Sequence, residues 1–92
     1  MGLSAFNFET IYCGEKISIL SEKIYYSENG IAERAFITSE GECRYRYDGG
    51  TPTMLEGHLL RDGSYISLDG ELQIRNFKAI GDARLSVSYE RK

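Results

Sequence analysis

Two cysteines and a single histidine are the side chains of this sequence with the widest range of possible chemistry. Cys13 and Cys43 lie thirty positions apart and belong to no Cys-x-x-Cys or Cys/His cluster, so their spacing argues against a zinc site. We expect two free, buried thiols in a protein made in a reducing cytoplasm, with a disulfide as the alternative. His58 stands at the start of an expected strand, which favours a polar residue near a sheet end over a general base.

Acidic and glycine-rich positions are the next candidates for ligand binding. The Asp-x-Asp-x-Asp spacing of a calcium loop is absent, so turn formation explains the aspartates that adjoin or lie near glycines, which are Asp48, Asp62, Asp69 and Asp82. The Gly49-Gly50-Thr51 segment lacks the Lys-Ser/Thr of a phosphate-binding loop and leads into no expected helix. No serine lies in a Gly-x-Ser-x-Gly elbow. We therefore expect no metal, cofactor or small-molecule substrate, and no enzyme activity.

Seven tyrosines without a tryptophan suggest two kinds of binding surface. An exposed row of coplanar tyrosines would make a sugar-binding platform, although tyrosines more often fill a half-buried sheet with the hydroxyl at its rim. The alternation of arginine and tyrosine over residues 44–47 suggests base stacking, but Glu40, Glu42 and Asp48 weaken the positive field. Because the net charge is −3 and no basic run exists, we expect no nucleic-acid partner.

The elements that must position these residues are short strands. One proline, ten glycines and many β-branched and aromatic residues are typical of strands separated by turns. Residues 17–26 also carry some helical spacing, but the alternation of Ile17 and Ile19 favours a strand. The expected strands are 6–12, 16–20, 24–26, 31–38, 43–47, 58–61, 64–68, 71–77 and 84–89, with turns at Asn29-Gly30, Gly41, Asp62-Gly63 and Asp69-Gly70.

This pattern predicts one all-β domain over residues 1–92. About eight short strands at regular spacing indicate an antiparallel β-sandwich, jelly-roll-like, or a small barrel, with little helix. No apolar stretch approaches the ~20 residues needed to span a membrane, and the N-terminal residues lack the features of a secretory signal, so we expect neither membrane insertion nor secretion.

The loop over residues 48–53 is expected to be structural. The side chain of Asp48 should cap the turn, Gly49 or Gly50 should take a positive φ, and Pro52 should fix its own backbone angle. The expected core consists of Ile37, Tyr45, Tyr47, Leu60, Ile66, Leu72, Ile74, Phe77, Ile80, Leu85 and Val87.

Apolar residues also fall on what should be the outer face of the sheet. If both Asp-Gly loops close two-residue hairpins, Leu60, Tyr65, Leu72 and Ile74 share one face, and Leu59, Ile66 and Leu68 lie on the other. A sheet with one solvated face should not carry apolar residues on both. The second face then needs a cover, which is the second layer of a sandwich, a neighbouring subunit or the N-terminal segment. The candidate interface residues are Phe6, Phe8, Leu59, Ile66 and Leu68.

Four segments carry a resemblance to a known group of proteins. They are Arg44-Tyr45-Arg46-Tyr47-Asp48-Gly49-Gly50-Thr51-Pro52-Thr53, Gly57-His58-Leu59-Leu60, Asn76-Phe77-Lys78-Ala79-Ile80 and Leu85-Ser86-Val87-Ser88-Tyr89. Over about residues 34–89 the chain resembles small β-rich proteins encoded among the structural genes of tailed bacteriophages and prophages. The resemblance implies a virion protein without catalytic residues, such as a capsid decoration, neck or tail accessory protein.

The resemblance also implies partners and a location. They are other copies of the chain, with a trimer as the candidate symmetry, and other virion proteins, so the protein would be made in the host cytoplasm and reside in the virion. A small carbohydrate-binding β-sandwich module is the alternative function.

Overall fold

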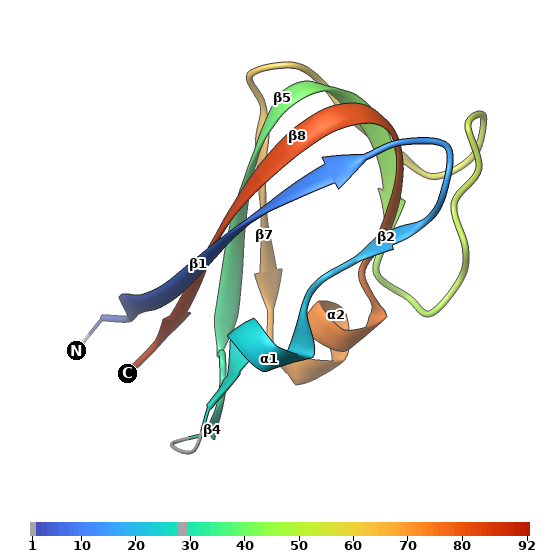
Figure 1. Ribbon diagram of the computed structural model, residues 1–92. Helices are drawn as coiled ribbons and strands as arrows, with labels where there is room; N and C mark the ends of the chain where they lie inside the picture. Colours follow the sequence, from blue (N-terminus) through green and yellow to red (C-terminus); the bar gives the residue numbers. More distant parts are fainter. Residues whose placement is uncertain (1, 28–29) are drawn as a thin grey trace.

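The computed structural model describes residues 2–27 and 30–92 (Figure 1). Strands make up 57% of the described residues and helices 11%, and the sheets are antiparallel, so the prediction of a mostly β fold with little helix is confirmed. The elements in chain order are β1 (Ser4–Cys13), β2 (Ser18–Ile19), α1 (Glu22–Tyr25), β3 (Tyr26–Ser27), β4 (Gly30–Ile31), β5 (Arg34–Arg46), β6 (His58–Leu60), β7 (Tyr65–Asp69), α2 (Glu71–Asn76) and β8 (Lys78–Arg91).

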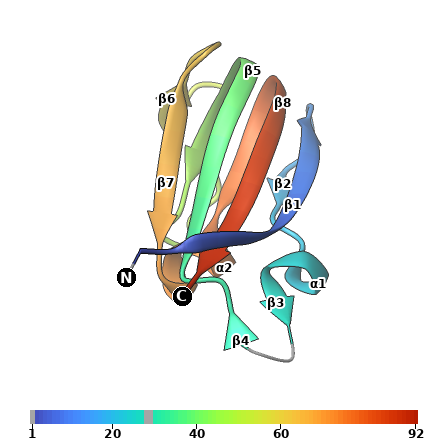
Figure 2. The same cartoon turned by 90° about the vertical axis from the view of Figure 1, so that its left-hand side faces the viewer.

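The two longest strands, β5 and β8, form the centre of a six-stranded sheet. They pair without interruption from Arg34 opposite Glu90 to Arg46 opposite Lys78. Along the free side of β8 lie β1 and then β2, and along the free side of β5 lie β6 and β7 (Figure 2). The sheet arches strongly but does not close (Figure 1). The expected sandwich or barrel is not confirmed, because the described strands form this open sheet and a separate β3–β4 ribbon.

Two glycines lie where the central pair bends. Gly41 of β5 has a φ of 96° and lies opposite Ala83, and Gly81 of β8 has a φ of 148° and lies opposite Cys43. A Cβ on Gly41 would lie 2.4 Å from the carbonyl oxygen of Asp82, and one on Gly81 would lie 2.7 Å from the Cα of Cys43. The close approach of the two backbones therefore requires glycine at both positions. The expected turn at Gly41 is wrong, because this residue bends a continuous strand.

The turn around Asp62-Gly63 is present but does not close a hairpin. The N–H of Ser64 donates to the carbonyl of Arg61 at 3.0 Å, and Gly63 has a φ of 80°. The same turn stays bonded to β5, since Gly63 N–H donates to Ser39 at 2.9 Å and Ser39 N–H donates to Ser64 at 3.0 Å. As a result β6 and β7 follow one another along β5 and do not pair with each other. The expected pairing across this turn, and the assignment of faces that depended on it, are wrong.

Both helices occupy segments that were expected to be strands, and both lie toward the open end of the arch (Figure 1). Gly70, at φ 89°, starts α2, and the guanidinium of Arg75 bonds Glu71 one turn earlier at 2.6 Å. The buried side chain of α2 is Ile74, whereas Leu72 is 76% exposed. In α1 the N–H groups of Ile24 and Tyr25 bond the carbonyl of Ser21. Among the described residues no helix has the length and apolar character to cross a membrane.

The expected Asn29-Gly30 turn includes Asn29, which lies outside the described residues. The strands on either side of it pair antiparallel, with Tyr26 opposite Ile31. The expected turn at Asp69-Gly70 leads into a helix, because the N–H of Ile74 bonds the carbonyl of Gly70 at 3.2 Å.

The core is largely confirmed. Ile37, Leu60, Ile74, Phe77, Leu85 and Val87 are buried, and Tyr45, Ile66 and Ile80 are half-buried. The two corrections are Leu72, which α2 turns outward, and Tyr47, which is 37% exposed beyond the end of β5. The described chain also buries residues that were not expected, among them Cys13, Leu20, Tyr25, Cys43, Leu68 and Tyr89.

Candidate functional site

The convex side of the arched sheet carries aromatic side chains from three strands. Phe8 and Tyr12 of β1 are 55% and 73% exposed, and Tyr65 of β7 is 67% exposed. Phe36 of β5 is half-buried and its ring lies 5.3 Å from that of Tyr65. We call Phe8, Tyr12, Phe36 and Tyr65 the convex aromatic face.

Strand register explains why these four residues share a face. Phe8 and Phe36 both lie opposite Ser88, on either side of β8. Tyr65 lies opposite Thr38, two residues along β5 from Phe36, so the two aromatic residues point to the same side. The intervening positions of β5 and β8 point inward, as the complete burial of Ile37 and Val87 shows.

Ion pairs accompany the aromatic residues on the same face. Arg34 pairs with Glu90, and Arg84 pairs with Glu40, each across the β5–β8 ladder. The hydrogen bond to Glu40 raises the pKa of the Arg84 guanidinium, which stays charged. Because these charges neutralise one another, they leave little net charge between the rings.

Of the candidate interface residues, Phe8 belongs to this face, and Leu59 is half-buried on β6 opposite Arg44. Leu68 is completely buried and Ile66 packs against the core, so neither lies on an outer face. A bulge between Ala5 and Asn7 takes Phe6 out of phase with Phe8. The ring of Phe6 packs against the core and lies 4.1 Å from the guanidinium of Arg91. Phe6, Ile66 and Leu68, which were candidates for an interface, therefore pack within the chain itself.

The loop after β5 is held by the side chain of Asp48. Its Oδ1 accepts hydrogen bonds from Gly50 N–H and Arg46 Nε, each at 3.0 Å, and its Oδ2 accepts one from Arg46 Nη2 at 2.7 Å. These donors lower the pKa of Asp48 to about 2. Gly49 has the expected positive φ, of 90°, and Pro52 is fully buried.

A second set of contacts rigidifies the tip of this loop. The hydroxyl of Thr53 accepts the N–H groups of Leu55 and Glu56 at 3.2 and 2.9 Å. The two apolar side chains at the tip, Met54 and Leu55, are 57% and 86% exposed. The loop therefore presents apolar groups from a fixed backbone.

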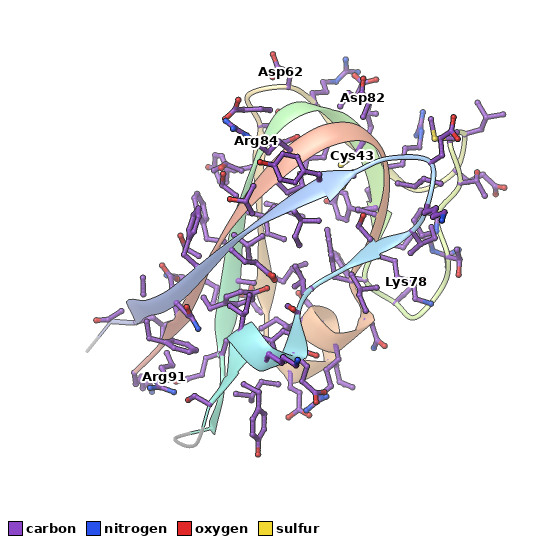
Figure 3. The ribbon with its side chains drawn as sticks, in the orientation of Figure 1. Cys43, Asp62, Lys78, Asp82, Arg84 and Arg91 are labelled. Atoms are coloured by element: carbon purple, nitrogen blue, oxygen red, sulfur yellow. The ribbon has the colours of Figure 1, made fainter. Side chains whose placement is uncertain are left out.

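A groove of about 620 Å³ runs between this loop and the bend of the sheet. Its lining mixes apolar side chains such as Leu59 and Ile80 with the carboxylates of Asp62 and Asp82, which lie near the top of the arch (Figure 3). Asp62 accepts a hydrogen bond from the Gly41 N–H at 2.8 Å, so this carboxylate supports the bend. Within residues 2–27 and 30–92, no three His, Cys, Asp or Glu side chains are placed to hold a metal ion.

His58 belongs to an aromatic cluster with two tyrosines. Its ring lies 5.3 Å from that of Tyr45 and 5.9 Å from that of Tyr47. The two tyrosine rings are tilted by 39° to each other, so they do not form the coplanar row of a sugar platform. Burial raises the pKa of Tyr45.

The two cysteines are free and buried, as expected. Each thiol influences the pKa of the other, in opposite directions. Interaction with the Cys43 thiol lowers the pKa of Cys13, whereas interaction with the Cys13 thiol, together with burial, raises the pKa of Cys43. The mutual influence of the two thiols could not be predicted from the sequence, because it depends on the pairing of β1 and β5 with β8.

Comparison of this chain with protein-family models, curated proteins and solved structures finds no match.

Proposed function

We propose that the protein is a non-enzymatic structural component of a tailed-phage or prophage particle, as a capsid decoration, neck or tail accessory protein. It acts by self-association and by docking on other virion proteins. The observation that carries the proposal is the convex aromatic face, where Phe8, Tyr12 and Tyr65 are each more than half exposed. A sheet that buries one face against its own core has no need for aromatic groups on the other, unless a partner covers them.

Face-to-face packing of two copies is the simplest way to cover this surface. Two sheets pack about 10 Å apart with interdigitated side chains, so the assembly would supply the two-layer sandwich between chains. Rings such as those of Phe8 and Tyr65 are large, rigid and enriched at the centres of interfaces. The likeness of residues 34–89 to phage structural proteins supports the location in a virion and a trimer as one form of the assembly.

The oligomeric state of the purified chain tests self-association. Size-exclusion chromatography with light scattering, at high micromolar concentration, should give a mass above that of the 10.4 kDa monomer. The double variant Phe8→Ser, Tyr65→Ser should shift the mass toward the monomer. Leu72→Ser is the matched control, because Leu72 is 76% exposed on α2, and this variant should assemble like the wild type.

Mass spectrometry of purified particles tests the location. The chain should be found in particles produced by a host that carries its gene. A strict monomer that is missing from every particle would contradict both parts of the proposal.

A small carbohydrate-binding module is the second candidate, and one contact favours it. The exposed ring of Tyr47 stacks on His58 with an interplanar angle of 23°. Binding to a glycan array that Tyr47→Ala abolishes, in a chain that does not self-associate, would favour this function over assembly.

A further inference from the structure

The outer face of the bent sheet carries a short apolar row beside the loop that follows β5. In the strand register Arg44 of β5 lies between Leu59 of β6 and Ile80 of β8, so the three side chains share one face. That face is the outer one, because the neighbouring Cys43 and Ala79 are buried in the core. Leu59 and Ile80 are half-buried and line the groove of about 620 Å³. Register across three strands therefore builds the apolar floor of the groove.

The loop after β5 forms one wall of the groove. Met54 of this loop lines the groove and is 57% exposed. The guanidinium of Arg44 donates to the carbonyl of Gly57 at 3.1 Å, which fixes the loop to the sheet. The groove therefore has an apolar floor and wall that are formed before any partner binds.

Two carboxylates lie directly opposite each other next to the apolar row. Glu42 of β5 is in register with Asp82 of β8, two residues along the strands from Arg44 and Ile80. Like charges at opposite positions destabilise an antiparallel pair, since their Cβ atoms lie only about 5 Å apart. No ion pair among the described residues involves either carboxylate. The carboxylate of Asp62 adds a third negative charge to the lining of the groove (Figure 3).

We propose that the groove binds an extended segment of another protein, in which one residue separates an apolar side chain from a lysine or arginine. Two such side chains point to the same side of an extended chain, about 6.8 Å apart, which matches the two-residue step from the apolar row to the carboxylates. The apolar side chain would contact Leu59, Ile80 and Met54, and the cation would lie over Glu42 and Asp82. The bound cation would offset the repulsion between the two carboxylates.

Charge favours a different protein over a second copy as the occupant. The chain has a net charge of −3 and three carboxylates line the groove, so a basic segment is attracted and another acidic chain is repelled. Within the described residues no three acidic, histidine or cysteine side chains are placed to hold a metal ion, so a side-chain cation fits the site better. The inference specifies the docking on other virion proteins and rests on that part of the proposed function, but it does not depend on self-association.

An NMR titration of the full ¹⁵N-labelled chain tests the groove. The probe is the peptide acetyl-Ser-Leu-Ser-Lys-Ser-amide, added up to millimolar concentration. The amide resonances of Gly41, Gly81 and Asp82, which line the groove, should shift. The titration is repeated with the Phe8→Ser, Tyr65→Ser variant, in which assembly does not interfere. Absence of binding in both proteins would overturn the groove proposal and leave the mass measurement of self-association unaffected.

A matched pair of charge variants separates the groove from general electrostatic attraction. Glu42→Gln, Asp82→Asn should weaken peptide binding about fivefold or more. Glu33→Gln, Asp69→Asn removes the same charges from exposed residues at the other end of β5, where Asp69 lies opposite Arg34, and should bind like the wild type. Equal weakening in the two double variants would overturn the proposal.

Two further controls test the apolar contact and the choice of partner. Met54→Ser should also weaken binding with every charge in place, so the test holds even if the groove charge variant fails to fold. The peptide with glutamate in place of lysine should not bind. Equal affinity for the two peptides, or shifts confined to other parts of the chain, would contradict the proposal. So would groove resonances that respond only to protein concentration, because a second copy would then be the occupant.

Discussion

At the scale of single residues, Asp48 is the side chain whose role is most sharply defined. It accepts hydrogen bonds from both Arg46 and Gly50, and these donors favour its charged form. The pKa of this carboxyl in the folded chain is therefore about 2, below its ordinary value of 3.8. The contacts tie the first turn of the loop to the end of β5.

The pH dependence of unfolding should reveal this residue. A carboxyl whose pKa is lowered by folding stabilises the protein above its unfolded pKa, and this contribution is lost as the pH falls through the folded pKa. Thermal unfolding of the wild type should therefore become easier between pH 3.8 and about 2. Asp48→Asn should be less stable at pH 7 and should lose less stability over that interval. Equal pH profiles for the two proteins would contradict this role.

Leu85 should be among the most costly positions to truncate. Leu85 belongs to β8, and its side chain is completely buried in the core. Leu85→Ala should therefore lower the free energy of unfolding by roughly 2–5 kcal/mol. The control is Leu55→Ala, because Leu55 is 86% exposed. This variant should change the free energy of unfolding by less than about 0.5 kcal/mol. Urea denaturation measures both. A small effect at Leu85 would mean that the strand is placed with the wrong face inward.

At the scale of elements, the bend of the β5–β8 pair depends on its glycines. Gly41→Ala places a Cβ within 2.4 Å of a backbone oxygen and forces a positive φ on alanine, so it should cost more than about 2 kcal/mol. Gly14→Ala is the matched control, because no atom lies within 4 Å of its added Cβ and its φ is not in the positive range. Equal free energies of unfolding for the two variants in urea denaturation would contradict the close approach of the β5 and β8 backbones at Gly41.

The edge strands also depend on this bend. β1 and β2 are separated by residues 14–17, and β6 and β7 by residues 61–64, and both interruptions face the bent part of the central pair. A straight edge strand would lose register with its neighbour there, so each edge is built from two strands. This explains why the Asp62-Gly63 turn does not reverse the chain.

At the scale of the whole molecule, the six-stranded sheet has two outer edges, and among the described residues β1 at one edge, and β6 and β7 at the other, pair with a strand on one side only. Because β1 pairs with β8 on one side only, its N–H groups should exchange hydrogen faster than those of β8, which lies between β1 and β5. If copies assemble through the convex aromatic face and the adjoining edge, exchange in residues 4–13 should slow as the protein concentration rises. Hydrogen exchange with mass spectrometry measures this. The Phe8→Ser, Tyr65→Ser variant should show no such dependence, and its absence in the wild type would contradict assembly through this region.

Several local features of this protein were determined by the sequence alone. The geometry of the 48–52 loop was predictable because aspartate, glycine and proline restrict their own backbone and that of their neighbours. The alternation of Leu85 and Val87 with polar residues likewise predicted which face of β8 is buried, since the side chains of a strand alternate. The mostly β character followed from composition in the same way.

The tertiary structure decided which strands pair and which outer residues share a face. Residues 58–69 lie along β5 because the turn at 61–64 bonds Ser39, a contact across more than twenty positions that no local pattern reports. No local pattern reports the bulge that separates Phe6 from Phe8 either. The convex aromatic face likewise depends on register, because its residues come from β1, β5 and β7. In α2, the burial of Ile74 against the sheet overrode the alternation that had predicted a strand. Local preferences act within a few residues, whereas pairing between distant strands is set by the packing of the whole core.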